Sequence, residues 1–355
     1  MSRRRKGRTG GIGRRFLAPV LCCALLAGLL CGCGQTEIPS ATRDIFAMDT
    51  YMTLTCYGEH AEEALARAVE EIHRLDDLLS TGKADSEVSR LNAEGGGPVS
   101  LQTQTMIEEA LRVYRRTEGA FDITVYPLME LWGFTGDSPA VPDEEALRTC
   151  LEKVGADRLK LSGDMLTMGE GQAIDLGAIA KGYTSARLMQ IFGEYELTSA
   201  IVSLGGNVQC FGTKPDGSLW RCGIREPEGD GYFGVVQAAD KAVITSGGYE
   251  RFFEEAGQTY HHILDPRTGQ PARAGLISAT VVSENGMLAD ALSTACYVMG
   301  LEDSADYWRE YGAEQGGTFE LILMTEDEEV WITEGLKEAF TTECPLHVIT
   351  AEGVE

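Results

Sequence analysis

Apolar side chains recur at helical spacing in one set of segments and alternate with polar ones in another. The helical spacing is clearest over 62–79, where Leu65, Ala68, Ile72, Leu75 and Leu79 fall on one face. The same pattern predicts further helices over 103–117, from a capping Asp143 onward, and over 177–192, 288–299 and 303–311.

Short alternating or apolar runs predict strands, first over 45–57 and then through a β-rich middle region. The later strands are expected over 159–161, 165–168, 199–204, 208–212, 220–224, 234–237, 242–245 and 276–282, with a short β region closing the chain. Helices and strands in this order, without an internal repeat, predict an α+β fold with one large domain of mixed sheets.

The first thirty residues follow a different pattern. Seven basic residues precede 16–30, a run of fifteen residues without a charge, which is the layout of an export signal. Plain secretion and retention as a transmembrane anchor are the alternatives, although about 20 apolar residues are needed to span a bilayer. The run ends at Leu30-Cys31-Gly32-Cys33, which resembles a bacterial lipobox. We therefore expect a signal peptide over 1–32, a lipid on Cys33, a lipid-anchored linker over 33–41 and a folded domain over 42–355.

Charge narrows the possible partners. The 355-residue chain carries a net charge of −25, and removal of residues 1–32 leaves the mature part at −32. So acidic a surface repels nucleic-acid backbones, which makes DNA or RNA a poor candidate ligand. A phosphate-bearing ligand would need a metal cation or a local group of backbone N–H donors.

The cysteines of the mature part leave two alternatives open. They are Cys56, Cys150, Cys210, Cys222, Cys296 and Cys344. Their spacing is irregular, which favours buried free thiols over disulfides without excluding a pairing.

The segment 173–183 places an aspartate before an apolar helix and a lysine six residues later. Asp175 can cap this helix, which is a purely structural role. Gly177 and Gly182 also permit close approach to the backbone, and the free N–H groups of a first helical turn suit an anion. Lys181 lies on the same turns and can reach a phosphate.

Two adjacent histidines end a predicted strand. Alternation along a strand sends His261 and His262 to opposite faces, so we expect one to face a site and the other to face solvent. A histidine that titrates near neutrality suits a general base. A zinc pair is not favoured, since adjacent strand residues do not converge on one ion.

Asp290 and Thr294 lie four residues apart, on one face of a predicted helix. The pattern alone favours an exposed carboxylate beside a buried threonine. With a backbone carbonyl, however, the two side chains would form a set of hard oxygen ligands suited to magnesium.

Taken in order, the motifs resemble those of the FAD:protein FMN transferase (ApbE) family. They are Phe46-Ala47-Met48-Asp49-Thr50, Ser86 to Asn92, Gly119-Ala120-Phe121-Asp122-Ile123-Thr124 with Leu131-Trp132-Gly133-Phe134, Asp175 to Gly182, Leu204-Gly205-Gly206-Asn207, Ser246-Gly247-Gly248-Tyr249, His262 to Gly269, and Asp290 to Ala295. The resemblance implies an exported α+β protein with a T-fold-like domain. It also implies an enzyme that uses FAD with Mg²⁺ and moves FMN to a Ser or Thr hydroxyl of a target protein, releasing AMP.

The resemblance also implies roles for particular residues. Metal ligands would be the carbonyl of Ala178, the carboxylate of Asp290 and the hydroxyl of Thr294, with Ser293 as a further contact. The FAD site would include Met48, Ala120, Phe121, Asp122, Asp175, Lys181, His262 and Leu264. We expect His262 to be the base that takes the proton of the acceptor hydroxyl, and Asp265 to orient or assist it.

Two departures from the family pattern leave the reaction partly open. Asp49 stands where the family commonly has glycine, and Gly82 stands where it often has an aromatic side chain that covers FAD. An uncovered FAD would admit water, so hydrolysis of FAD to FMN and AMP is the alternative activity, and a non-catalytic flavin-binding lipoprotein is the alternative from another class. The expected acceptor is a membrane redox subunit or an extracellular electron-transfer protein, met outside the cytoplasm at the bacterial cell membrane.

Overall fold

The computed structural model describes residues 38–227, 229–313 and 318–354. The predicted signal peptide and the predicted lipid site at Cys33 lie outside the described residues. No helix in the described part is long and apolar enough to cross a membrane. Pro39–Glu355 forms one compact unit, and the following paragraphs concern that unit.

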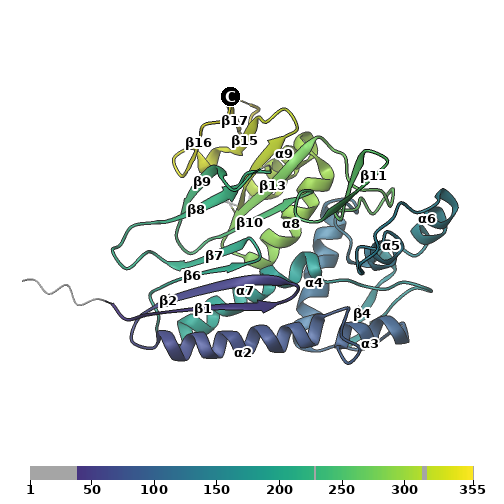
Figure 1. Cartoon of the computed structure of the whole chain (residues 1–355), viewed down its shortest axis with the longest axis horizontal. Helices are drawn as coiled ribbons and strands as arrows, with labels where there is room; N and C mark the ends of the chain where they lie inside the picture. Colours follow the sequence, from purple (N-terminus) through teal and green to yellow (C-terminus); the bar gives the residue numbers. More distant parts are fainter. Residues whose placement is uncertain (1–37, 228, 314–317, 355) are drawn as a thin grey trace, which may run out of the picture. The chain divides into compact units, whose positions relative to one another are not determined.

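A nine-stranded sheet runs through the unit (Figure 1). Its strands, in spatial order, are β1 (Ser40–Ala47), β2 (Thr50–Tyr57), β6 (Ser199–Leu204), β7 (Asn207–Gly212), β10 (Ala242–Gly247), β13 (Leu276–Ser283), β14 (Phe319–Thr325), β15 (Val330–Thr333) and β17 (Leu346–Ile349). All neighbours are antiparallel except β15 and β17. The predicted α+β class is confirmed.

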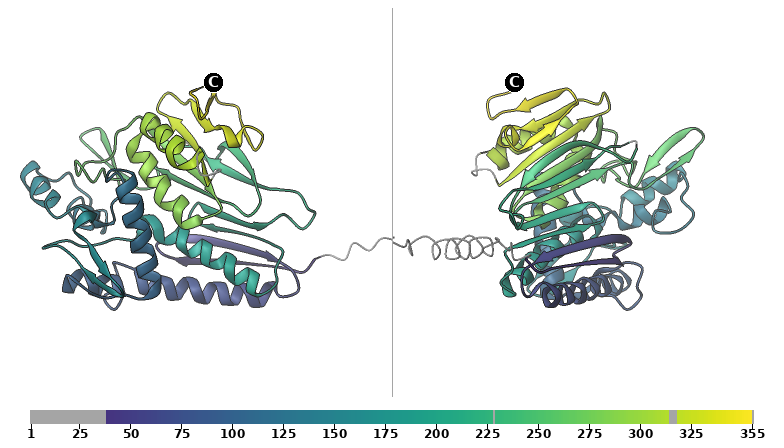
Figure 2. Two further views of the ribbon diagram at one scale, coloured as in Figure 1. Left: turned by 180° about the vertical axis from the view of Figure 1, so that it is seen from behind. Right: turned by 60° about the vertical axis from the view of Figure 1, so that its left-hand side comes forward.

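Helices cover one face of this sheet, as the view from behind shows (Figure 2). The helices of the unit are α2 (Ala61–Leu79), α3 (Glu87–Glu94), α4 (Leu101–Arg116), α5 (Tyr126–Leu131), α6 (Glu144–Leu151), α7 (Gly177–Glu194), α8 (Gly286–Met299) and α9 (Leu301–Tyr307). Short helical turns cover Ile123–Val125, Ala156–Arg158 and Glu334–Leu336, and a π-helical turn covers Trp308–Ala313.

Three small sheets complete the unit. They are β8 (Trp220–Arg225) with β9 (Tyr232–Ala238) and β16 (Phe340–Thr342); β3 (Gly96–Pro98) with β5 (Met165–Thr167) and β4 (Lys160–Ser162); and the hairpin of β11 (Phe252–Glu255) and β12 (Gln258–His261). The first of these packs on the face of the large sheet opposite the helices, because Cys222 and Ile224 share a hydrophobic cluster with Val243 and Val282.

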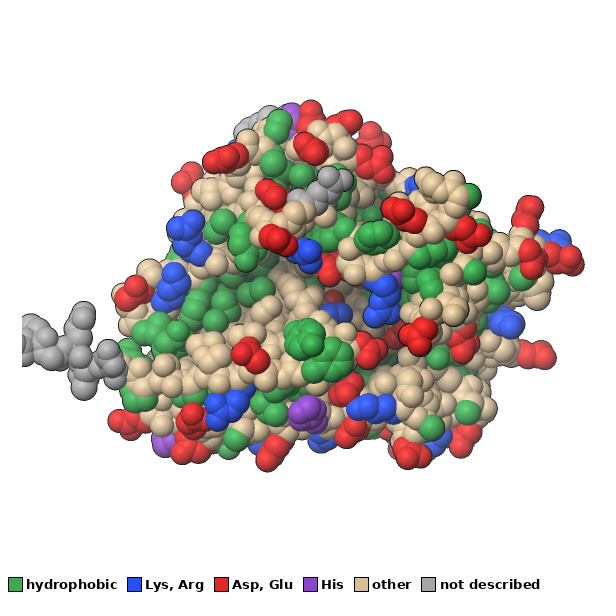
Figure 3. Space-filling model, in the orientation of Figure 1, with side chains coloured by type: hydrophobic (Ala, Val, Ile, Leu, Met, Phe, Trp, Pro, Cys, Tyr) green, Lys and Arg blue, Asp and Glu red, His purple; other side chains and the backbone are tan. Residues whose placement is uncertain are grey.

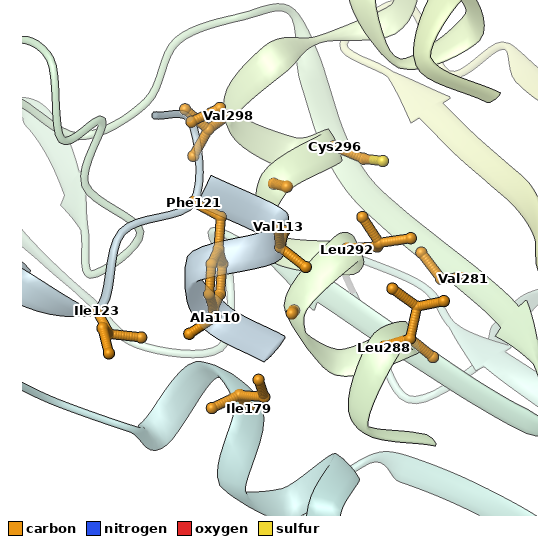
Figure 4. Close-up of a cluster of buried hydrophobic side chains, with 14 of the residues drawn as sticks. Ala110, Val113, Phe121, Ile123, Ile179, Val281, Leu288, Leu292, Cys296 and Val298 are labelled. Atoms are coloured by element: carbon orange, nitrogen blue, oxygen red, sulfur yellow. The ribbon is translucent and has the colours of Figure 1, made fainter. Parts of the chain in front are cut away.

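Alternation in the central strands divides the core into two layers. Ile244 and Val281 turn toward α4 and α8, whereas their neighbours Val243 and Val282 turn toward the small sheet. Figure 4 shows the helical layer, in which Phe121 packs among side chains of α4 and α8. These central strands are buried on both faces, which explains their nearly continuous apolar sequence.

The strand predicted over 45–57 is wrong in one respect, because it is a hairpin of β1 and β2. The chain reverses at Met48 and Asp49, whose φ angles are 49° and 57°. Two successive residues with positive φ form the tight turn that suits the twist of a hairpin, and aspartate tolerates this conformation better than most residues. No glycine or proline marks the turn between the apolar run 45–48 and the alternating residues that follow it, so the pattern gave no sign of it.

Most of the predicted helices are confirmed, and Asp143 caps α6 by accepting from the Ala146 amide. The helix expected over 303–311 is instead α9 followed by the π-helical turn. The strand expected to end at the adjacent histidines is β12, whereas the pattern missed α3, α5 and β11, which are short elements. It also understated the closing β region, because β14, β15 and β17 extend the large sheet.

Candidate functional site

A cavity of about 1280 Å³ opens on the face of the large sheet that carries β8 and β9. Its walls come from the β1–β2 turn, the loop after α2, the start of α5, the first turns of α7, one side of α8, the strand β8 and the segment around His262. Figure 3 shows basic and acidic side chains together in the central hollow, and hydrophobic ones along its extension. Of the residues expected in the site, Asp265 and Ser293 are outside the cavity lining and the others line it.

The first turns of α7 meet α8 at unusually short range. A Cβ on Gly182 would lie 2.2 Å from the Gly286 carbonyl oxygen and 2.5 Å from the Asp290 Cβ, so glycine is required for this approach. The Gly182 N–H donates to Asp290 Oδ2 at 2.7 Å, and the Asn207 amide donates to Oδ1 at 2.9 Å. This set of Ala178, Gly182, Asp290 and Thr294 is called the α7–α8 corner below.

The expectation of an exposed carboxylate beside a buried threonine is wrong. Asp290 is 4% exposed, while Thr294 is half-buried. The reason is that α8 is buried on nearly its whole circumference, so the usual polar face of a helix is missing. Ser246 joins the corner through its hydroxyl, which lies 2.8 Å from that of Ser293 and 3.2 Å from that of Thr294.

Positive side chains face the cavity beside the start of α7. Asp175 Oδ1 accepts from the Gly177 N–H at 2.7 Å, although Leu176 occupies the helix-capping position. Burial raises the pKa of Asp175, and the Gly177 amide, Lys181 and Arg251 oppose that rise. Lys181 and Arg251 therefore both lie near this carboxylate, and they supply positive charge to an acidic protein.

His262 lines the cavity, just beyond the end of β12. Its Nδ1 lies 3.1 Å from the Arg251 carbonyl oxygen, which also accepts from the His262 backbone N–H at 3.0 Å. A carbonyl can only accept, so Nδ1 carries the proton and Nε2 keeps a lone pair. Burial and the charge of Arg251 lower the pKa of His262 to about 4, so the ring is neutral at physiological pH.

His261 does not face solvent as expected. Its Nε2 lies 3.0 Å from the Ala272 carbonyl oxygen, and its ring meets that of Tyr297 edge-on, with ring centroids 5.4 Å apart. The β11–β12 hairpin folds over the Tyr297 side of α8, so both faces of the strand end against protein. His261 is therefore part of the packing behind the cavity.

Asp265 does not contact His262 through any hydrogen bond found among the described residues. Its carboxylate instead binds the Arg267 guanidinium, with Nε–Oδ1 and Nη2–Oδ2 distances of 2.9 and 3.0 Å. Its backbone closes the turn to Gln270. The Arg251 carbonyl therefore orients the His262 ring, which is the role expected of Asp265.

Several of the residues expected to line FAD also have structural roles. Ala120 and Phe121 are buried in the core and reach the cavity with one side. Asp122 accepts from the Thr124 amide and hydroxyl and from the Ala156 amide, and burial raises its pKa. Leu264 is buried beside a bridge to Pro271. The Met48 backbone N–H donates to Asp76 Oδ1 at 3.1 Å.

The six cysteines of the described part are free thiols, and five of them are buried. Cys210 and Cys222 come closest to a pair, with their sulfur atoms 3.6 Å apart. The favoured interpretation, buried thiols in the core, agrees with this structure.

Sequence reasoning missed the roles of four residues that line the cavity. Arg251 follows the Ser246 to Tyr249 motif by two residues, and this proximity was the available signal. Asn207, the last residue of the Leu204 to Asn207 motif, proves to be a partner of Asp290. Arg221 and Arg225 lie in a strand that carries no motif, so nothing in the pattern distinguished them.

The chain is similar to known proteins over most of its length. The model of the ApbE family matches residues 48–316. A FAD:protein FMN transferase of Treponema pallidum (strain Nichols) is 33% identical over 317 residues, covering 82% of this chain and 87% of that protein. One from Vibrio cholerae serotype O1 is 36% identical over 244 residues, covering 66% of this chain and 72% of that protein.

Solved structures show the same fold. The ApbE protein of Thermotoga maritima superposes with a TM-score of 0.79 at 32% identity, covering 84% of this chain and 98% of that one. The flavin transferase ApbE of Vibrio cholerae gives a TM-score of 0.71 at 27% identity, covering 86% and 98%. A family model that matches most of the chain, together with these relatives, establishes that the chain belongs to the ApbE family.

Proposed function

We propose that this protein transfers the FMN half of FAD to a Ser or Thr hydroxyl of another protein and releases AMP. The single observation that carries the proposal is the cavity itself, which gathers residues from Met48 to Thr294 that belong to separate motifs. Relatives named FAD:protein FMN transferase support it. A pyrophosphate group is negatively charged, and the cationic side chains of Lys181 and Arg251 line this cavity.

Magnesium would be held by the Asp290 carboxylate, the Thr294 hydroxyl and the Ala178 carbonyl. These are hard oxygen donors that line one cavity. The Gly182 N–H, which faces the Ala178 carbonyl in a regular helix, donates to Asp290 Oδ2, and a carbonyl oxygen has a second lone pair to offer a metal. When bound, the cation neutralises pyrophosphate charge and stabilises the AMP that leaves.

Lys181 and Arg251 would take up the remaining phosphate charge. Both act on the half-buried Asp175 and on His262, so both lie within electrostatic reach of the same part of the cavity. Arg251 is held in place by a hydrogen bond from its Nη1 to the Phe134 carbonyl oxygen at 3.2 Å. A guanidinium fixed at one nitrogen still has donors to offer a phosphate.

His262 would act as the general base. The acceptor hydroxyl loses its proton to the free Nε2 while its oxygen bonds to the phosphorus of the FMN half. The bond from that phosphorus to the oxygen of the AMP half breaks, and AMP departs with the electron pair. The low pKa keeps the ring neutral and able to accept, at the cost of a smaller driving force for proton transfer.

The test is direct labelling. The mature domain is incubated with FAD, Mg²⁺ and cell-envelope proteins of its own host, and flavin fluorescence is read after denaturing electrophoresis. Fluorescent bands that survive denaturation are expected, and mass spectrometry of those bands identifies the acceptor and the modified residue. We expect a membrane redox subunit or an extracellular electron-transfer protein. Absence of any covalent flavin with FAD bound would exclude the transfer reaction.

Hydrolysis of FAD is a second candidate, favoured by one observation. Gly82 lines the cavity, and a Cβ there would meet nothing closer than the Ser80 hydroxyl at 3.7 Å, so this wall is open. Release of AMP at the same rate with and without acceptor protein would favour hydrolysis. Release that depends on the acceptor favours transfer.

We further propose that the protein is an exported lipoprotein attached to the bacterial cell membrane through Cys33. The basic segment, the uncharged run and the lipobox-like ending support this. In cells fed a radioactive or clickable fatty acid, wild-type protein should take up the label and Cys33→Ala should not, while Cys31→Ala remains labelled. Equal labelling of Cys33→Ala would show that the lipid is attached to another residue.

A further inference from the structure

The strand β8 borders the cavity with its open edge. It is the last strand of its sheet and pairs with β9 on one side. Residues Arg221, Cys222, Gly223, Ile224 and Arg225 all line the cavity, without a gap. Because successive side chains point to opposite faces of a strand, a cavity against one face would touch every second residue. A run of five consecutive lining residues means that the cavity follows the edge.

The backbone groups on this edge are unpaired within the described residues. The ladder of β8 is shared with β9, and the other backbone hydrogen bonds of the described chain do not involve 221–225. Such an edge is a template for an added strand, and peptide-binding domains use it in this way.

The part of the cavity along β8 contains none of the residues that are expected to bind FAD. Those residues come from the β1–β2 turn, 120–122, α7, α8 and the segment at His262, and none comes from β8 or β9. Ligand pockets usually measure about 300–1000 Å³, which the present cavity exceeds. Apolar side chains of the large sheet, Ile201, Val208 and Val243, form the floor beside β8.

The β8 edge is positively charged in an otherwise acidic protein. Arg221 and Arg225 are exposed, and neither forms an ion pair with a described residue. Asp230, from the turn after β8, and Glu250, beside Tyr249, are acidic side chains that also line the cavity. Arg225 lies near Tyr249, where it opposes the burial that raises the pKa of that phenol to about 12. Tyr249 precedes Arg251 by two residues, so this end of β8 leads toward His262.

We infer that β8 binds the acceptor protein as an added strand, in which an extended segment with acidic residues beside its Ser or Thr lies along the edge of β8 and presents the hydroxyl to His262. This inference rests on the proposed transfer reaction and names what recognises the acceptor. Backbone pairing would supply affinity for an extended chain, and Arg221 and Arg225 would supply the preference for acidic neighbours.

A peptide pool tests this although the acceptor is unidentified. The probe is a library of 13-residue peptides with a central Thr and random residues elsewhere, incubated with the mature domain, FAD and Mg²⁺. Flavin-labelled peptides are isolated by fluorescence and sequenced. We expect enrichment of Asp and Glu on at least one side of the Thr. For the variant R221E/R225E we expect that enrichment to disappear and Lys or Arg to be enriched instead, with labelling of the best wild-type peptide reduced about tenfold.

The gain of basic peptides distinguishes this result from misfolding, since an unfolded variant labels nothing. The matched control is R115E/R148E, which changes the net charge equally at two exposed arginines outside the cavity. It should keep the wild-type preference for acidic peptides. An unbiased wild-type selection, or the same selection from R221E/R225E, would overturn the role of these arginines.

The strand pairing has its own test. The best labelled peptide is resynthesised with a single N-methyl group at each position in turn, which removes one N–H donor at a time. Pairing with β8 predicts losses at every second position, because alternate N–H groups of a strand face its partner. Equal tolerance at all positions would overturn the pairing. If wild-type enzyme labels neither peptides nor envelope proteins, the transfer reaction itself fails, which is a separate result.

Discussion

The α7–α8 corner and the β8 edge lie in one cavity but are built in opposite ways. In the corner, Asp290 is buried, both of its oxygens accept hydrogen bonds, and Gly182 brings two helices into contact. Along the β8 edge, the backbone groups have no hydrogen-bond partner among the described residues, and the arginines are exposed. The corner needs no partner to hold its geometry, which suits chemistry, whereas the edge is completed by a partner, which suits recognition.

Removing the charge of the corner should have the largest effect. Asp290→Asn keeps the size of the side chain but loses the negative charge, so we expect labelling to fall about a thousandfold, since several kcal/mol of charge stabilisation would be lost. Labelling of an acceptor by FAD, read as denaturation-resistant fluorescence, measures this.

The control for Asp290→Asn is Asp303→Asn, an exposed aspartate of α9. It should label at the wild-type rate. A thermal melt of both variants checks that the buried substitution leaves the fold intact. Normal labelling by a folded Asp290→Asn would remove the corner from the reaction.

Loss of the base should rank second. His262→Gln should lower the labelling rate about a hundredfold or more, which is the usual contribution of a general base. The exposed His73→Gln on α2 is the matched control and should behave as wild type. An unchanged rate for His262→Gln would assign the proton transfer to another group.

The pH profile sharpens this prediction. The base works in its neutral form, and the pKa of His262 is lowered to about 4, first by burial and then by Arg251, with His261 and Lys181 adding to the effect. Activity should therefore hold as the pH falls from 7 to 5 and decline as it approaches 4. A decline centred near 6.5, the ordinary value for histidine, would show a ring that is not depressed in the enzyme.

Much of the fold was predictable because most elements are long and regular. The spacing of Leu65, Ile72 and Leu75 defined α2, and Asp143 was recognised as the cap of α6. The site residues were predictable for a different reason, namely that their motifs resemble a family. Spacing alone placed Asp290 on the exposed side of its helix, which the structure contradicts.

The other features of the fold and the site could not be predicted from the sequence, because they depend on contacts between segments that are far apart in the chain. The turn at Met48 and Asp49 has no glycine to mark it, so the sequence predicts one strand where the structure has β1 and β2. Asp290 is buried because Gly182, 108 residues earlier, lets α7 approach α8. The open edge of β8 follows from the order of strands in its sheet, which no local pattern specifies.

A third prediction concerns the packing of the corner. Gly182→Ala would place a methyl group against the Gly286 carbonyl and the Asp290 side chain, so α7 and α8 must separate. We expect a loss of about 1–3 kcal/mol in the free energy of unfolding, as for other overpacked cores, and a tenfold or greater loss of labelling. Denaturant unfolding and the labelling assay measure the two effects.

Gly193→Ala, in the same helix, is the control, and we expect it to change the free energy of unfolding in the opposite direction. A Cβ there would meet Phe211 at an ordinary 3.9 Å. Alanine in a helix is favoured over glycine by about 0.5–1 kcal/mol, so this variant should be slightly more stable and fully active. Equal behaviour of the two variants would show that the close approach of α7 and α8 has no role.

The smallest effect is expected at the open wall formed by the loop after α2. Gly82 has no positive φ and has free space beyond its Cα, so Gly82→Tyr should fold normally and place a ring over the cavity. Stacking of aromatic groups contributes about 0.5–1.5 kcal/mol, so FAD should bind up to about tenfold more tightly. Fluorescence titration with FAD measures this, and Gly82→Ala, which adds no ring, should leave the affinity unchanged.

Gly82→Tyr also separates the two candidate activities, because a covered flavin excludes water. Acceptor-independent AMP release should fall in this variant while labelling persists. If AMP release without acceptor is as fast in Gly82→Tyr as in the wild type, the open wall at Gly82 is not what admits water.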